Sequence, residues 1–350
     1  MATFTIPIAA ADTMVAIVRS RSKTCTEWPP SEYAILVKAS EIKRQYSCRF
    51  FFFMRHSPIS RIALSVLICG ASVGCTKSGG SSPMEPTPPV AGSTIVYTAI
   101  GASDANGVGS TSLCPPFATE TTCPNGMGYV PVTVRQLKAQ GFTLSHLSLG
   151  IPTAVIGRDF QTLGQQYNRE IVANFIEQEM PFVQQNATVV TIFAGLNEVN
   201  VITAALGGGA GGSDPNGYVD AQVRAFGTDY ATLLAGIRAR AGSPRIVTLN
   251  VPNAAGLPFL ARTTLAQRQV AQRASVAMTR TVINPLVSQS VRVVDLMCDA
   301  RSYLTANYSS DGLHPNDAGY AFIAGEVVRA ITSGSYSSPQ ASCGAMTLVP

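Results

Sequence analysis

The sequence predicts an α/β fold, a three-layer α/β/α sandwich around a central five-stranded parallel sheet of the flavodoxin-like type. From about residue 93 onward, short runs of β-branched apolar residues alternate with longer amphipathic stretches. This alternation is typical of βαβ units. The apolar runs are almost uninterrupted, which is expected of strands whose two faces are both covered by helices.

Each element follows from its local pattern, taken in chain order. The expected strands are Ile95–Ile100, Thr143–Leu149, Thr188–Phe193, Arg245–Asn250 and Val291–Leu296. The expected helices are Val132–Gln140, Arg169–Gln184, Tyr218–Ala241, Thr264–Ser288 and, at the end of the domain, Asn316–Ile331. The glycine-rich segment 207–217 is interpreted as a surface loop between a strand and a helix, with a mobile lid as the alternative.

The region before the domain has the order of a secretory leader. Within residues 54–74, two arginines precede a short apolar stretch and then small residues, which is the pattern of a signal peptide. The apolar stretch is shorter than the roughly 20 residues that span a bilayer. Gly74-Cys75 resembles a bacterial lipobox, so we expect a lipoprotein-type signal with lipidation at Cys75, and secretion after cleavage is the alternative. Residues 1–53 precede this leader and are interpreted as a non-native extension, with Met54 as the true start.

Composition then divides the remainder of the chain. Residues 75–92 are rich in Ser, Gly and Pro and are predicted to be a linker that tethers the domain to the membrane. Residues 93–335 form the expected domain and residues 336–350 a tail. Residues 1–74 hold nine Lys/Arg against four Asp/Glu, whereas residues 75–350 hold sixteen of each. The basic excess therefore belongs to the leader and does not indicate a nucleic-acid partner, and we expect a monomer.

The cysteines agree with export to the bacterial cell envelope, facing the periplasm, or to the medium. After Cys75 the chain has four, an even number that suits an oxidising compartment. Four cysteines allow three pairings, of which we favour Cys114–Cys123 and Cys298–Cys343. Their spacing matches no metal site, and we expect neither a metal nor an organic cofactor.

Reactive side chains follow several predicted strands. Ser103 follows the first strand, Asn197 follows the third, and Asp311 and His314 lie in the loop before the last helix. In an open α/β sheet, ligands bind at the carboxyl ends of the strands, so these side chains are expected to share one edge. Ser103 does not belong to a G-x-S-x-G elbow, because Ala105 occupies the last position of that motif.

Histidines are few enough to limit the choice of a base. After residue 74 only His146 and His314 remain. His146 falls inside a predicted strand and is interpreted as structural. His314 follows Asp311 at a spacing that lets the carboxylate hold one ring nitrogen while the other faces a serine. On its own this spacing also suits a turn that caps a helix.

Taken together, GASD, G-x-N and D-x-x-H resemble blocks I, III and V of the SGNH (GDSL-like) hydrolases. The resemblance covers residues 93 to about 331. It implies an exported serine esterase that forms an acyl-enzyme, with Ser103 as nucleophile, His314 as base, Asp311 as its orienting carboxylate and Asn197 as a side-chain oxyanion donor. The Ser103 N–H is implied as another donor. In block II, either Thr153 or Gly150 supplies the remaining N–H.

Three positions depart from the family pattern. Ala102 stands where Asp is common, Glu198 where Asp is usual after the Asn, and Thr153 where the oxyanion glycine aligns. None of them lies in the implied proton path. They leave one alternative, a non-catalytic cell-envelope protein that binds carbohydrate or lipid with the same fold. The substrate class stays open among lipid, short-chain and acetylated-sugar esters.

Overall fold

Five parallel strands form the sheet of the domain, in the order β4-β3-β5-β6-β7. Their bounds are β3 Thr94–Ile100, β4 Thr143–Ser148, β5 Val189–Phe193, β6 Arg245–Leu249 and β7 Arg292–Val294. The computed structural model describes residues 13–16, 35–38 and 85–350. The predicted α/β/α sandwich with a five-stranded parallel sheet is confirmed, and each expected strand exists within three residues of its expected bounds.

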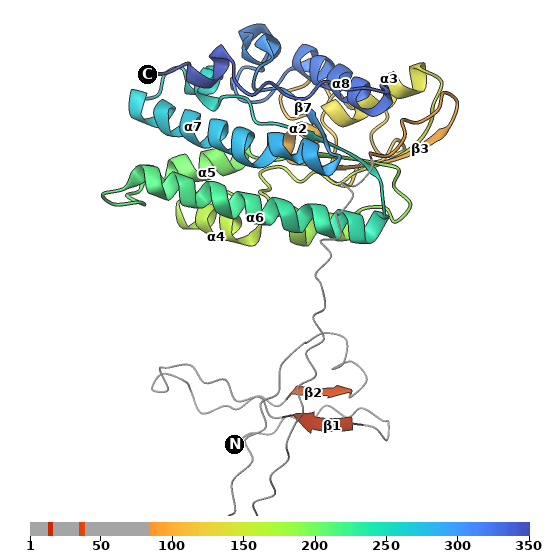
Figure 1. Ribbon diagram of the computed structural model, residues 1–350, viewed down its shortest axis with the longest axis horizontal. Helices are drawn as coiled ribbons and strands as arrows, with labels where there is room; N and C mark the ends of the chain where they lie inside the picture. The colour runs from red at the N-terminus through yellow and green to blue at the C-terminus, as the bar shows by residue number, and fades with distance from the viewer. Residues whose placement is uncertain (1–12, 17–34, 39–84) are drawn as a thin grey trace, which may run out of the picture. The chain divides into compact units, whose positions relative to one another are not determined.

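Helices cover both faces of this sheet (Figure 1). Helices α3 (Tyr129–Ala139) and α8 (Asp317–Thr332) pack on one face, against a set that includes Tyr97 and Val247. Helices α4 (Arg158–Gln166), α5 (Leu196–Gly207), α6 (Pro215–Ala241) and α7 (Leu265–Met278) share the core of the other face. Because side chains alternate along a strand, each strand contributes to both cores, and this explains its continuous apolar run.

The predicted helix Arg169–Gln184 is wrong. Residues 169–173 have no regular secondary structure, and Asn174 forms a bridge with Val155, which accepts from the Phe175 N–H at 2.8 Å and donates to the Ala173 carbonyl at 3.2 Å. Only a π-helical turn, Phe175–Glu179, and a 3₁₀ turn, Met180–Phe182, follow. The apolar periodicity of the segment reflects packing between loops, and Pro181 at the start of the second turn prevents a longer helix.

Helices α4 and α5 were not among the expected helices. The glycine-rich segment 207–217 joins α5 to α6, rather than a strand to a helix. Helix α7 ends at Met278, ten residues before its expected end, and continues as a π turn and a 3₁₀ turn that contains Pro285.

The end of the linker is attached to the domain. The Glu85 carboxylate forms ion pairs with Arg245, at 2.7 Å, and with Arg292. The side chains of these two arginines are 3% and 4% exposed, respectively. These two arginines begin β6 and β7, so the attachment lies at the amino ends of the strands. This is the edge of the sheet opposite to the strand ends that lead into Ser103 and Asn197.

The N-terminal unit, residues 1–76, is described only in part. It contains two short strands, β1 (Thr13–Ala16) and β2 (Ile35–Lys38), which pair antiparallel. The expected signal peptide, 54–74, and Cys75 lie outside the described residues. Within the described ranges, no helix has the length and apolar character needed to cross a membrane.

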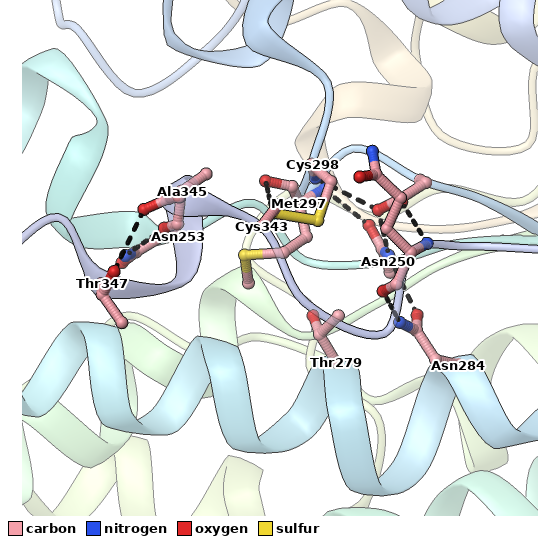
Figure 2. The surroundings of a disulfide bond; sticks show 12 residues. Asn250, Asn253, Thr279, Asn284, Met297, Cys298, Cys343, Ala345 and Thr347 are labelled. Atoms are coloured by element: carbon pink, nitrogen blue, oxygen red, sulfur yellow. Dashed lines mark hydrogen bonds between the residues drawn. A yellow bond between two sulfur atoms is a disulfide. The ribbon is translucent and has the colours of Figure 1, made fainter.

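Two disulfides have the favoured pairing, Cys114–Cys123 and Cys298–Cys343. The second attaches the C-terminal tail to the loop that follows β7, as Figure 2 shows. Beside it, the Asn253 side-chain amide donates to the Ala345 carbonyl at 2.8 Å. The tail is thus held against the loops at the carboxyl ends of β6 and β7.

Candidate active site

The nucleophile turn lies where β3 ends. Ser103 is the first residue of a short helix, α2 (Ser103–Asn106), and is 8% exposed. Gly109, further along the same motif, has a φ of 91°. A Cβ at this position would lie 2.8 Å from the His314 Cβ, so the glycine lets the histidine loop approach the turn closely.

The structure brings Ser103, His314 and Asp311 together. His314 Nε2 lies 2.9 Å from Ser103 Oγ, and His314 Nδ1 lies 2.7 Å from Asp311 Oδ2. The histidine loop is closed on itself, because the Ser309 N–H donates to the His314 carbonyl at 2.9 Å. The capping role considered for Asp311 belongs instead to Asn316, which accepts from the N–H groups of Ala318 and Gly319 at the start of α8.

Asp311 is held as an anion. Partial burial raises its pKa, but hydrogen bonds outweigh this effect and lower the pKa to about 2. One oxygen accepts from the His314 ring, and the other accepts from the backbone N–H groups of Leu313 and His314 and from the Ser309 hydroxyl. A fixed carboxylate at Nδ1 selects the tautomer whose Nε2 accepts from the serine and stabilises an imidazolium.

Asn197 lies at the start of α5, directly after β5, and borders the same cavity as Ser103 and His314. One of its amide hydrogens binds the Ala154 carbonyl, with a distance of 2.8 Å. A carboxamide carries two N–H donors, so the second is available to a substrate oxygen.

Gly150 and Thr153 have different surroundings. A Cβ on Gly150 would lie 2.7 Å from the Ala105 Cβ, so this glycine packs behind the nucleophile turn. Thr153 has a φ of 67°, in the left-handed region that suits the glycine it replaces in the family pattern. Neither residue lines the cavity, whereas Ala154 does. Within the described residues, the backbone N–H groups of Ser103, Gly150 and Thr153 donate no hydrogen bond.

The cavity at Ser103 is small, about 20 Å³. Its wall is mainly apolar, with the polar groups gathered at the serine. It is lined by Ala102, Ser103, Asp104, Ala154, Phe175, Phe193, Ala194, Gly195, Leu196, Asn197, Glu198, Leu313 and His314. The glycine-rich segment 207–217 does not border it, which favours the surface-loop interpretation.

Three further carboxyl groups surround the site. Burial raises the pKa of Asp104, which lines the cavity, although the His314 charge opposes the shift. Burial also raises the pKa of Glu198 to about 7 and that of Glu179 well above its usual range. Asp104 is the last residue of GASD and Glu198 follows the Asn of G-x-N, so both belong to recognised motifs. Glu179 could not be predicted, because nothing in EQEMPF distinguishes a buried carboxyl from an exposed one.

His146 lies in β4, outside this cavity. Its side chain is buried and burial lowers its pKa, which suits the structural interpretation. Among the described residues, no group of three or more His, Cys, Asp or Glu side chains is arranged to hold a metal ion.

Comparison with known proteins gives one family. The model of the GDSL-like Lipase/Acylhydrolase family matches residues 99–322, more than half of the chain. No curated protein matches. Among solved structures, the chain is similar to the lipase Lip_vut3 from a goat rumen metagenome, with 16% identity over 69% of this chain and 100% of that one and a TM-score of 0.45.

Two other solved structures have similar values. A catalytic mutant of Axe2, an acetylxylan esterase from Geobacillus stearothermophilus, has 14% identity over 71% of this chain and 99% of that one, with a TM-score of 0.45. An extracellular lipase from Streptomyces rimosus has 13% identity over 67% of this chain and 99% of that one, with a TM-score of 0.46.

Proposed function

Since the chain belongs to the GDSL-like lipase/acylhydrolase family and is an ester hydrolase at that level, we propose that Ser103, His314 and Asp311 form its catalytic triad. The observation that carries the proposal is the continuous line of hydrogen bonds, 2.9 Å from Ser103 Oγ to the His314 ring and 2.7 Å from that ring to Asp311. A serine nucleophile needs such a base within hydrogen-bond reach.

The reaction follows from this geometry. Ser103 Oγ bonds to the ester carbonyl carbon while its proton moves to His314 Nε2. His314 returns that proton to the alcohol oxygen as the carbon–oxygen bond breaks, which leaves an acyl group on Ser103. Water then adds to the acyl carbon, giving its proton to His314. When the intermediate collapses, the proton passes to Ser103 Oγ and the acid is released.

The oxyanion that forms in both steps needs donors. We assign this role to the Asn197 amide, the Ser103 N–H and one N–H of the segment that contains Gly150 and Thr153. Asn197 borders the cavity with one amide hydrogen available, which supports its role. Loss of one such donor costs about 10²–10³ in kcat, and we expect that loss for Asn197→Ala in a steady-state ester assay. A wild-type kcat in this variant would exclude Asn197 as a donor.

The size of the cavity favours short acyl groups. A volume of about 20 Å³ holds little more than one ordered water, which takes roughly 10–15 Å³. We therefore propose short-chain or acetylated esters as substrates, ahead of long-chain lipids. A series of p-nitrophenyl esters of rising chain length tests this, with kcat/KM expected to be highest for acetate and to fall steeply beyond butyrate. A maximum at octanoate or longer would contradict it.

The catalytic assignment itself is tested with a fluorophosphonate that labels activated serines. The wild-type protein should be labelled, whereas Ser103→Ala and His314→Ala should not. His146→Ala is the matched control and should be labelled like the wild type. Equal labelling of all four proteins would exclude Ser103 as the labelled nucleophile and with it the triad. No labelling of a correctly folded wild type would favour the binding-protein alternative.

We also propose export and membrane attachment through a lipidated Cys75. The two disulfides support an oxidising compartment, and the leader pattern supports the lipoprotein route. In a bacterial host, the wild-type protein should enter the detergent phase on phase separation, and Cys75→Ser should remain in the aqueous phase. If both partition alike, the lipid anchor is excluded.

A further inference from the structure

The segment between β4 and α4 that contains Thr153 is held at both of its ends. We call residues 150–156 the oxyanion loop, in keeping with the proposed function. Near its end, the Ile156 N–H donates to the Glu198 carboxyl, and the Ala154 carbonyl accepts from Asn197 at 2.8 Å. At its start, the Ile151 N–H donates to the Gly101 carbonyl at 3.3 Å.

Thr153 lies between these attachments in a conformation that it does not prefer. A φ of 67° is uncommon for any residue with a side chain, and more so for a β-branched one. Such a conformation persists only where the surrounding structure imposes it. The Ala154 N–H donates to the Ile151 carbonyl at 3.0 Å, which closes a tight turn with Pro152 and Thr153 at its centre, and the hydrogen bonds at residues 151, 154 and 156 attach this turn to its surroundings.

Glu179 holds the residue that joins the nucleophile turn to this loop. Its side chain is fully buried, and Oε2 accepts from the Gly101 N–H at 3.0 Å. Gly101 lies two residues before the nucleophile, and its carbonyl accepts from the N–H of Ile151, which lies two residues before Thr153. The carboxyl group therefore fixes Gly101, and Gly101 binds the oxyanion loop.

We propose that Glu179 is a positioning residue, which keeps the backbone donor of the oxyanion loop in register with Ser103. The inference rests on the proposed function and extends it to a residue outside the motifs. It also explains why a carboxyl group is retained in a site where an apolar side chain would avoid the cost of burying it. Glu179 acts through Gly101, which in turn binds Ile151, and it touches no reacting atom.

The main test is Glu179→Met, which keeps the volume of the side chain and removes the acceptor. Because oxyanion donors act in the transition state more than on the bound ester, kcat should fall by about 10–100-fold while KM changes by less than about threefold. Glu179→Gln keeps an oxygen that can accept from the Gly101 N–H, so it should restore kcat to within about fivefold of wild type. Glu177→Met is the matched control, because Glu177 lies in the same turn with its carboxylate bound to Arg158 at the surface, and kcat should not change.

Hydrogen exchange gives a readout that needs no activity. Peptides that cover residues 149–157 should exchange faster in Glu179→Met than in wild type, and at the wild-type rate in Glu177→Met. Wild-type kcat in a folded Glu179→Met, no rescue by Glu179→Gln, or unchanged exchange would each overturn the proposal. If Glu179→Met does not fold, Glu179→Asp replaces it, with kcat expected to fall about tenfold, and an unchanged kcat would overturn the proposal.

These outcomes are distinct from failure of the proposed function. If Ser103→Ala is as active as wild type, or if wild type is neither active nor labelled, the triad assignment fails. If wild type is active, Ser103→Ala is inactive and Glu179→Met matches wild type, then only the role of Glu179 fails.

Discussion

At the scale of single residues, charge placement decides what the site can do. Asp311 and Glu198 are both carboxyl groups near His314, yet their pKa values move in opposite directions, to about 2 and to about 7. The difference comes from burial, which dominates at Glu198, and from hydrogen bonds, which dominate at Asp311. The Asp311 carboxylate therefore binds the His314 ring as an anion, whereas Glu198, with a pKa of about 7, lines the cavity.

Asp311→Asn tests the first of these groups. The amide keeps the shape but removes the charge and can donate to Nδ1, which favours the tautomer that cannot accept from Ser103. By analogy with triads in general, kcat should fall by about 10³–10⁴-fold, with little change in KM. Steady-state kinetics on a short-chain ester measures this. A loss of less than about tenfold would show that Asp311 does not orient His314.

Glu198→Gln tests the second group through the pH dependence of stability. Its folded pKa of about 7 lies above its ordinary value of 4.5, so the folded state holds this proton more tightly than the unfolded state. The resulting stability is fully present below about pH 4.5 and is lost as the pH rises through 7. The wild-type Tm should therefore fall between pH 5 and pH 8, and the fall should be smaller in Glu198→Gln. Equal slopes in the two proteins would contradict the assignment.

At the scale of elements, the strands were predictable and several helices were not. The apolar runs at residues 95–100 and 245–249 are longer than is usual in a loop. For a strand that is buried on both faces, such a run is the main local signal in the sequence. Helix α4 was missed, and residues 169–184 were wrongly assigned as a helix. The apolar residues near 171–175 pack against Val155 across the chain, a contact that periodicity cannot reveal.

The attachment of the linker to the domain also belongs to the scale of elements, and the composition of the linker did not predict it. Residues 75–92 were predicted as a tether, yet Glu85 binds two buried arginines at the amino ends of β6 and β7. Uncompensated buried charge is costly, so these arginines need the carboxylate.

Glu85→Ala tests that need. Removing one partner of a buried ion pair costs about 3–5 kcal/mol. Glu85 itself is 38% exposed, so we expect a smaller loss, about 1–3 kcal/mol in the free energy of unfolding. Urea denaturation of the protein measures this. Glu120→Ala, which removes a surface pair with Lys138, is the control and should have no measurable effect. A loss of the same size in both variants would show that the linker attachment does not stabilise the domain.

At the scale of the whole molecule, the two disulfides act on very different lengths of chain. Cys114–Cys123 closes a separation of 9 residues beside the nucleophile turn, whereas Cys298–Cys343 closes one of 45 and holds the tail (Figure 2). In the chain-entropy description, the longer loop restricts the unfolded chain more.

Replacing each cysteine pair by serines tests this difference. We expect a loss of about 4 kcal/mol for Cys298→Ser with Cys343→Ser, and about 2.5 kcal/mol for Cys114→Ser with Cys123→Ser. Denaturation of the two variants under the same conditions compares them. A larger loss from the short loop would show that native contacts near the nucleophile turn outweigh chain entropy.

The sequence by itself determined the fold class and the five strands, because buried strands carry their signal locally. It favoured one of three cysteine pairings, and it pointed to Ser103, Asn197, Asp311 and His314 through the resemblance of their motifs taken together. The roles of these residues, and the choice between Gly150 and Thr153, stay predictions.

Only the tertiary structure decided which groups meet. It brought His314 to 2.9 Å from Ser103 across 211 positions of sequence, and it revealed that the buried Glu179 binds the Gly101 N–H of the nucleophile turn. A carboxyl group gains such a role from burial and from a backbone N–H that arrives from the end of another strand. The residues beside Glu179 in the sequence indicate neither its burial nor its hydrogen-bond partner, so its role could not be predicted from the sequence.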